Sequence, residues 1–195
     1  MNSTDMKYTQ KIQRAIKFSV KTHEVYQKQK RKGKDIAYIT HPLTVGLILS
    51  QAGASEDVIV AGILHDTIED SPDHKKVDAA MIKDRFGDHV AELVVSVTEA
   101  DQSLPWADRK REAREHIADF SIDSLLVKSA DVLSNTSEIV DDFARYGDEV
   151  FERFSASKAD SLNHYLLAIE ALIKRWPESP LADDLRGVAE NLRKL

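Results

Sequence analysis

The chain contains an apolar run, residues 58–64, that has no polar side chain. A helix that is apolar on every face is normally buried. Four ionisable residues follow within six positions: His65, Asp66, Glu69 and Asp70. Ionisable groups at the end of a buried helix are unfavourable unless their charge is balanced, and a bound cation is the simplest way to balance it. The sequence therefore predicts a buried helix that leads into a cation site.

Most of the chain has the apolar spacing of three and four that is typical of helices, with few glycines and no Asn-Gly or Asp-Gly hairpin signal. We therefore predict an all-α fold. Serine caps, prolines and glycines place the ends of the helices. The expected helices cover about 9–27, 42–52, 55–70, 78–85, 89–98, 106–120, 123–146, 157–175 and 181–193.

The length of 195 residues, with no internal repeat and no long linker, predicts one domain over residues 1–195, with a core of about 8–175 and a C-terminal helix at 181–193. The absence of cysteine excludes disulfides and thiolate metal sites. No apolar run approaches the ~20 residues that span a bilayer, and no secretory signal is visible, so we expect no membrane partner and a cytoplasmic protein. A net charge of −6 argues against nucleic-acid partners. The sequence is silent on oligomeric state.

A basic loop interrupts this acidic chain. Five cations fall within seven residues just ahead of His41: Lys28, Lys30, Arg31, Lys32 and Lys34. Next to a metal site, such a loop favours a small anionic ligand. A solvated loop after a helix is the alternative interpretation.

Spacing predicts how the ionisable residues combine. In one continuous helix, His65 stacks on Glu69 and Asp66 on Asp70, while His65 and Asp66 point about 100° apart and can reach one ion. Imidazole and carboxylate together suit manganese, iron, zinc or cobalt. Further ligands must come from elsewhere, and His41 is one candidate. Asp131 is another, since its neighbourhood is apolar, although it can instead be a satisfied ion-pair partner.

The combination resembles the HD-domain metal phosphohydrolases, whose signature is a His, a later His-Asp and a distant Asp. Within them the chain is similar to the hydrolase domain of the RelA/SpoT homologues, specifically the stand-alone small alarmone hydrolases. The resemblance covers about residues 8–175. The matching segments are Arg31-Lys32, Tyr38-Ile39-Thr40-His41-Pro42, Ala61 to Asp70, Arg85-Phe86-Gly87, Val97-Thr98, Ser103 to Trp106, Arg109-Lys110, and Val127 to Asp131 with Asn135.

The resemblance implies an HD-domain bundle of about 8–10 helices and a manganese-dependent enzyme, with another divalent metal as an alternative. It implies that the metal ligands are His41, His65, Asp66 and Asp131, and that the acid/base and water-orienting pair is Glu69 and Asp70. It also implies that Arg31, Lys32 and Asn135 contact the substrate. The expected substrates are the alarmones of the stringent response, guanosine tetra- and pentaphosphate, cut at the 3′-diphosphate to give pyrophosphate and GDP or GTP. Because the chain lacks the length of a synthetase domain, we expect hydrolysis without synthesis.

Some positions depart from the family pattern. The link 33–37 is one residue longer and lacks a proline, Gln102 replaces a common lysine, and Ser129 and Ser134 replace Leu and His. Two other functions therefore stay open. One is a phosphohydrolase of another nucleotide, such as an adenosine alarmone, the 2′-phosphate of NADPH or a nucleoside monophosphate. The other is a non-catalytic regulator with a relic site. The remaining histidines are expected at the surface or at helix caps: His23, His74, His89, His116 and His164.

Overall fold

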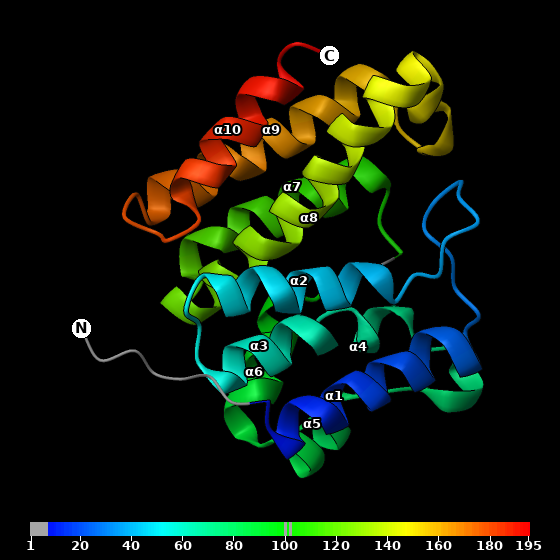
Figure 1. The fold of residues 1–195 in the computed structure, drawn as a ribbon, viewed down its shortest axis with the longest axis vertical. Coiled ribbons are helices and arrows are strands. Elements are labelled where there is room, and N and C mark those ends of the chain that lie inside the picture. The colour runs from blue at the N-terminus through cyan, green and yellow to red at the C-terminus, as the bar shows by residue number, and fades with distance from the viewer. Residues whose placement is uncertain (1–7, 100, 102) are drawn as a thin grey trace.

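The structure is a computed structural model that describes residues 8–99, 101 and 103–195, and this part of the chain is helical (Figure 1). Gln102, where the family pattern has lysine, lies outside the described residues. The α-helices are α1 (Gln10–Val20), α2 (Thr40–Gln51), α3 (Glu56–Leu64), α4 (Thr67–Asp70), α5 (Ala79–Phe86), α6 (Asp88–Val97), α7 (Trp106–His116), α8 (Ile122–Tyr146), α9 (Lys158–Arg175) and α10 (Ala182–Leu192). Short helical turns are η1 (Lys21–Tyr26), η2 (Asp73–Lys75), η3 (Ile117–Asp119) and η4 (Gly147–Arg153). The all-α prediction is confirmed, while the division into domains stays a prediction.

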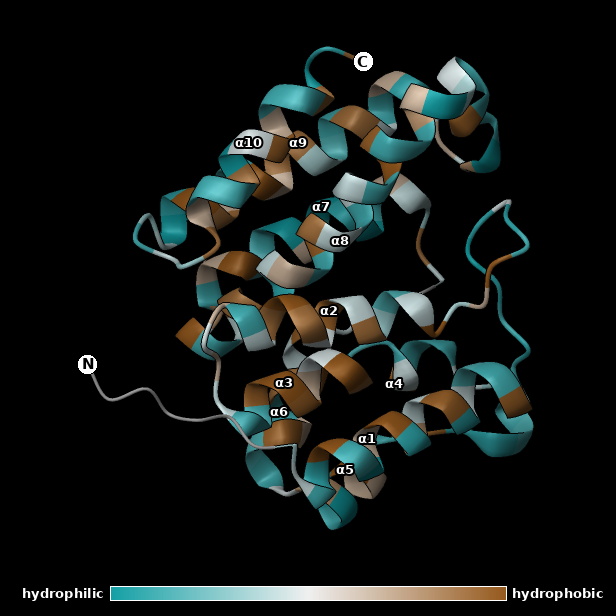
Figure 2. Ribbon diagram, viewed as in Figure 1, coloured by the Kyte–Doolittle hydropathy of each residue, from teal (hydrophilic) through white to brown (hydrophobic). Residues whose placement is uncertain are grey.

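Two hydrophobic clusters meet along α8. The first cluster surrounds α3, which Figure 2 shows as a largely hydrophobic helix, and it includes residues from α1, α2, α5 and α6. The second cluster lies between α8, α9 and α10. Helix α8 contributes Val127 and Ala130 to the first cluster and Leu125 and Val132 to the second. This long helix therefore positions whatever side chains it carries between the two parts of the bundle. Within the described residues, no helix combines the length and the hydropathy needed to cross a bilayer.

Close contact between α2 and α3 depends on glycine. A Cβ atom built on Gly62 would lie 2.2 Å from Cδ1 of Leu49, and one built on Gly46 would lie 2.7 Å from Cγ1 of Ile63. A larger residue at either position would force the facing side chain to shift within the packed core. The packing joins the start of α2 to the end of α3, and this is where His41 and His65 lie.

The structure corrects one predicted element. Residues 55–70 were expected as one helix, but α3 ends at Leu64 and α4 begins at Thr67, with His65 and Asp66 between them. His65 Nδ1 donates to the Gly62 carbonyl at 2.8 Å, and Thr67 Oγ1 donates to the Leu64 carbonyl at 2.7 Å. Side chains that bond to the last carbonyls of a helix compete with its continuation. His65 and Asp66 therefore lie in a turn, not in a continuous helix.

Candidate metal centre and adjoining pocket

The four predicted metal ligands lie together in the structure. The Nε2 atoms of His41 and His65 are 3.3 Å apart, and Asp66 Oδ2 is 3.0 Å from His65 Nε2. The potential ligand atoms of His41, His65 and Asp66 all lie within 4.8 Å of one another. Asp131 Oδ1 completes the group at 3.3 Å from His41 Nε2 and 3.8 Å from His65 Nε2. Residues from α2, the α3–α4 turn and α8 thus converge on one point.

Hydrogen bonds fix the orientation of both imidazoles. The Gly62 carbonyl can only accept, so His65 Nδ1 carries the proton and, in the neutral ring, Nε2 presents a lone pair to the cluster. His41 Nδ1 lies 3.0 Å from Ser134 Oγ, which likewise leaves Nε2 facing the cluster. Ser134 is one of the departures from the family pattern, and here its hydroxyl serves as the partner of His41. Outer partners of this kind are typical of metal-binding histidines.

The two carboxylates are also held from outside. Tyr38 Oη donates to Asp66 Oδ2 at 2.5 Å. Asp131 accepts from Asn135 Nδ2 at 2.7 Å and pairs with Lys128 Nζ at 2.8 Å. Asp131 is thus both an ion-pair partner and a member of the cluster, so the two interpretations of its sequence position are compatible. Each potential ligand is positioned by a neighbour outside the cluster.

The cluster has an unusual charge balance. Burial lowers the pKa of His65, but the Asp66 and Asp131 carboxylates outweigh that effect and raise it to about 9. Burial raises the pKa of Asp131, and the stronger pull of Lys128 and the two imidazoles leaves it well below its usual range. The carboxylate oxygens of Asp66 and Asp131 therefore favour a positive charge at the centre of the cluster. Two nitrogen and two oxygen donors that share a buried focus fit a borderline divalent cation, so the residues present suit the metal that the sequence predicts.

Glu69 and Asp70 lie in α4, beyond the His65–Asp66 turn. Asp70 Oδ2 accepts from Gln29 Nε2 at 2.9 Å, and Glu69 Oε2 accepts from the Glu99 backbone N–H at 3.4 Å. Burial, and next the negative charge of Asp66, raises the pKa of Asp70 to about 7. Burial also raises the pKa of Glu69. Carboxyl groups with raised pKa values can hold or accept a proton near neutral pH.

The predicted substrate residues line one cavity of about 300 Å³, together with residues from α7, α8 and α9. Arg31, Lys32 and Asn135 are in its wall, as are Trp106 and Tyr165. Two lining residues hydrogen-bond to the cluster, Tyr38 to Asp66 and Asn135 to Asp131. The cavity and the candidate metal centre therefore share a wall.

Helix α8 holds the basic loop in place. Arg31 donates from Nε to Glu138 Oε2 at 2.9 Å and from Nη2 to Asn135 Oδ1 at 2.8 Å. Lys34 forms ion pairs with both Glu138 and Asp142. Within the loop, the Arg31 N–H donates to the Ile36 carbonyl at 2.8 Å. The lengthened loop is thus an ordered turn, and three of its cations line the cavity: Arg31, Lys32 and Lys34.

Several residues of the site were not predicted. Expected at the surface or at a cap, His23 is in fact fully buried, and its Nδ1 lies 2.9 Å from Gln29 Oε1, which links it to Asp70. His164 is half-buried and lines the cavity, which also corrects the prediction. Lys128 and Glu138 have no local signal beyond their helical spacing from Asp131. The other three histidines, His74, His89 and His116, are exposed as predicted.

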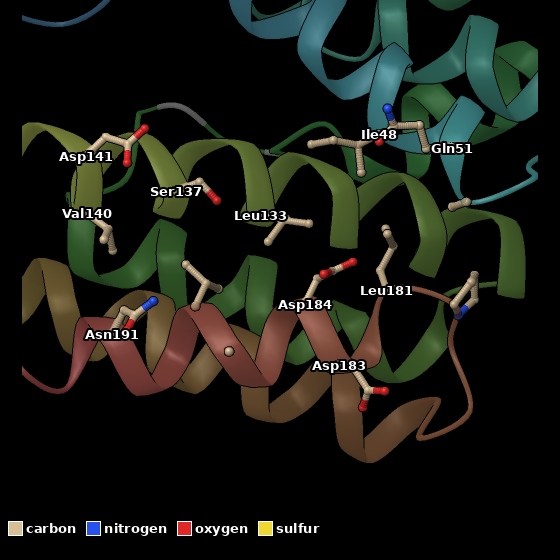
Figure 3. Close-up of a pocket in the computed structure, with 14 residues that line it drawn as sticks. Ile48, Gln51, Leu133, Ser137, Val140, Asp141, Leu181, Asp183, Asp184 and Asn191 are labelled. Carbon is tan, nitrogen blue, oxygen red and sulfur yellow. The ribbon is translucent and has the colours of Figure 1, made fainter.

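A larger hollow lies elsewhere. A groove of about 610 Å³ runs between α2, α8 and α10, and Figure 3 shows Asp141, Asp183 and Asp184 at its rim and Leu133 between them. None of the predicted site residues lines this groove. The ionisable cluster adjoins the smaller cavity and not this groove. We therefore do not assign the groove as the reaction site, although it is larger.

Comparison with known proteins identifies a family and several similar sequences. The HD domain family matches residues 15–160. The chain is 34% identical to guanosine-3′,5′-bis(diphosphate) 3′-pyrophosphohydrolase of Aquifex aeolicus over 68% of this chain and 18% of that protein. It is 36% identical to the enzyme of the same name, MESH1, of Xenopus tropicalis over 66% of this chain and 69% of that protein. It is 39% identical to the MESH1 of Danio rerio, over 60% of this chain and 63% of that protein.

Solved structures show the same fold. The structure of a metazoan orthologue of SpoT that is described as hydrolysing ppGpp superposes with a TM-score of 0.78, over 97% of this chain and 99% of that one. Its sequence identity is 23%, so this likeness shows the fold alone. A Listeria monocytogenes protein superposes with a TM-score of 0.70 over 79% of this chain and 97% of that one, and the sequence identity is 28%. With three quarters of its length matched by the family, this chain belongs to the HD domain family.

Proposed function

We propose that this protein hydrolyses the 3′-diphosphate of guanosine tetra- and pentaphosphate, giving pyrophosphate and GDP or GTP. The observation that carries the proposal is a His-His-Asp-Asp cluster that shares a wall with a cationic cavity. A cavity of about 300 Å³ is at the lower end of the range for small-molecule sites. The names of the relatives from Aquifex aeolicus and Xenopus tropicalis support the same substrate.

We assign His41, His65, Asp66 and Asp131 as the residues that hold one divalent ion. Manganese is the ion we propose, because the mixed imidazole and carboxylate donor set suits it and the family resemblance points to it. Such an ion would polarise a phosphoryl oxygen and lower the pKa of a water molecule. Tyr38 and Lys128 keep the two carboxylates in position from outside the cluster.

The acid/base work falls to Glu69 and Asp70. Both carboxyl groups have raised pKa values, and both lie one turn beyond Asp66. We propose that Glu69 accepts a proton from the attacking water. Asp70, whose pKa of about 7 allows it to carry a proton, then supplies one to the leaving oxygen. Gln29 fixes the Asp70 carboxyl for this step, since it donates to Oδ2.

Substrate positioning falls to the basic loop and α8. Arg31 lies against the Tyr38 ring, with 5.5 Å between its guanidinium carbon and the ring centroid, and it is oriented by Glu138. A planar guanidinium can bind phosphate oxygens in pairs, whereas Lys32 acts as a point charge. We propose that these two cations and Asn135 hold the diphosphate. The predicted cytoplasmic location belongs to this proposal.

The test is a product screen with the purified chain, with manganese and with a chelator control. The panel contains guanosine tetraphosphate, an adenosine alarmone, NADPH and nucleoside monophosphates, and product is measured as pyrophosphate or phosphate. We expect pyrophosphate from guanosine tetraphosphate, lost in Asp66→Ala and in Glu69→Gln. Glu170→Gln, an exposed carboxyl on α9, is the matched control and should retain activity. If guanosine tetraphosphate stays intact while another nucleotide is hydrolysed, the proposed substrate is wrong. If no nucleotide is hydrolysed, the proposal that this chain is an enzyme is wrong.

A further inference from the structure

A third cavity, of about 380 Å³, lies on a different part of the bundle from the metal centre. It is formed by the end of α1, the π-helical turn η1, the segment 74–77 and α5. Its lining residues are Phe18, Lys21, Thr22, Tyr26, His74, Lys75, Lys76, Val77, Met81 and Arg85. None of the predicted metal ligands or substrate residues is among them.

The charge of this cavity is one-sided. Four cationic side chains line it, and no lining residue is acidic. Among the described residues, no carboxylate oxygen lies within 4.0 Å of the charged nitrogens of Lys21, Lys75 or Arg85, and Lys76 Nζ donates to the Ser71 carbonyl at 3.3 Å. In a chain with a net charge of −6, cations are normally distributed among carboxylates. This cavity therefore concentrates positive charge that the protein itself does not neutralise.

Aromatic rings hold these cations instead. Lys21 Nζ lies 5.4 Å from the centroid of the Tyr26 ring, and Lys75 Nζ lies 5.7 Å from the same centroid. The Arg85 guanidinium lies 5.1 Å from the centroid of Phe18. Ring faces attract cations without cancelling their charge, so the N–H donors of Lys75 and Arg85 stay free to bind an anion. The pKa of the Tyr26 hydroxyl is lowered, first by its hydrogen bond with Lys21 and also by Lys75 and Arg85.

The cavity also offers room and apolar contact beside the cations. Its volume lies within the range of small-molecule sites. Val77, Met81 and the Phe18 ring supply an apolar wall for the organic part of a ligand. We propose that this cavity binds a small phosphate-bearing ligand of nucleotide size, with Lys21, Lys75 and Arg85 on the phosphates and the apolar wall against the remainder.

The cavity is separate from the proposed reaction site, but it shares the turn η1 with residues that hold Asp70 in place. The turn η1 places Lys21 and Tyr26 in the cavity, while its His23 bonds to Gln29, which holds Asp70. On the other wall, the segment 74–77 follows α4 after residues 71–73, and its Val77 N–H donates to Ser71 Oγ at 2.9 Å. The proposal does not depend on the proposed hydrolysis, since it concerns binding at residues outside that site.

The test is a titration of the full chain with inorganic pyrophosphate in the presence of a chelator, followed by amide chemical shifts in ¹H–¹⁵N spectra. We expect saturable shifts in residues 21–26, 74–77 and 85. In Lys75→Gln/Arg85→Gln the affinity at this site should fall by about tenfold or more, since two charge-assisted contacts are removed. Lys83→Gln removes one charge from the same helix, where Lys83 pairs with Asp88 outside the cavity, and it should bind like the parent chain.

Shifts confined to residues 31–34 and 135–138 would overturn the proposal, and so would equal affinity in the double variant and in Lys83→Gln. A short DNA duplex and vesicles of anionic lipid are titrated in parallel. Binding of either one through Lys75 and Arg85, without any response to pyrophosphate, would also overturn it. Thermal unfolding checks that the double variant is folded. If it is not, Arg85→Gln alone gives the same test, because the Arg85 side chain is exposed.

Discussion

Gly33 is the residue of the basic loop whose replacement has the most readily worked consequence. Its φ of +69° lies in the left-handed region. A Cβ atom placed on Gly33 would lie 2.4 Å from Cγ and 2.6 Å from Cδ of Arg153. Arg153 donates from Nη1 to Asp142 Oδ2 at 3.0 Å, and Asp142 also pairs with Lys34. Gly33→Ala therefore strains the loop and pushes Arg153 away from Asp142, the carboxylate of α8 that Lys34 of the loop also contacts.

The magnitude follows from these two effects. An alanine in the left-handed region costs about 1–2 kcal/mol. Loss of the part-buried Arg153–Asp142 pair costs about 1 kcal/mol. Together they would lower the free energy of unfolding by about 2–3 kcal/mol if the loop kept its conformation. The loop can instead leave α8, which limits the loss of stability and moves Arg31 and Lys32 away from the cavity. In the proposed reaction we then expect KM to rise about tenfold, the equivalent of one charge-assisted hydrogen bond to phosphate, with kcat little changed.

Gly53→Ala is the matched control. Gly53 has a φ of +74°, but a Cβ there would meet nothing within 4 Å, and the residue caps α2 away from the basic loop. It should show the strain of about 1–2 kcal/mol alone, with an unchanged KM. Urea unfolding and initial rates on both variants make the comparison. An equal KM in Gly33→Ala and the parent chain would refute the reasoning, and so would an equal rise in KM in Gly53→Ala.

Three other consequences can be measured directly. A chelator should lower the melting temperature by about 5–11 °C, because metal at about 100 times its Kd contributes about 2.7 kcal/mol and each kcal/mol shifts a chain of this size by about 2–4 °C; Asp66→Ala should show no such response. Tyr38→Phe removes the donor to Asp66 and should weaken metal binding about tenfold in a competition titration, whereas unchanged affinity would contradict the assigned role. Burial, and next the charge of Lys110, lowers the pKa of His164 from 6.5 to about 3, so His164 stays neutral in the folded state while the unfolded state gains a proton as the pH falls below 6.5. The contribution of His164 to the free energy of unfolding should thus be complete above pH 6.5 and fall toward pH 3. When the pH is lowered from 7.5 to 5.5, the free energy of unfolding of His164→Phe, measured in urea, should fall by about 1 kcal/mol less than that of the parent chain.

Helix boundaries could be predicted where the signal is local. Ser55, Ser121 and Ser157 accept from backbone N–H groups at the starts of their helices, and Gly53 and Gly147 adopt positive φ after theirs. Each of these outcomes depends on a few neighbouring residues, so sequence alone is sufficient. The break after Leu64 was not predicted because no proline or cap residue marks it. It depends on hydrogen bonds of the His65 and Thr67 side chains, whose positions the packing of α3 decides.

The candidate ligands were predicted in a similar way, and their supporting residues were not. His41 directly precedes Pro42, which marks the start of a helix, and His65 is the first ionisable residue after the apolar run 58–64. His23 gives no such sign, because its burial results from contacts with Gln29 and Tyr38, which lie beyond the end of its own turn η1. No signal in residues 21–26 predicts that this turn is a π-helix in which Thr22 and His23 are buried. Burial of that kind depends on tertiary packing, which a single sequence does not state.

One signal for the supporting residues was present and is physically readable. Polar residues recur on α8 at positions 131, 135, 138 and 142, a spacing of four, three and four that places them on one face. Asp131 contacts His41, Asn135 and Glu138 hold Arg31, and Asp142 holds Lys34. A polar stripe along the helix where the two hydrophobic clusters meet has to face partners that satisfy it. Because one rigid helix carries the whole stripe, the candidate metal centre and the basic loop are set at a fixed separation. Any substrate that spans both must therefore match the rise along α8 between Asp131 and Glu138.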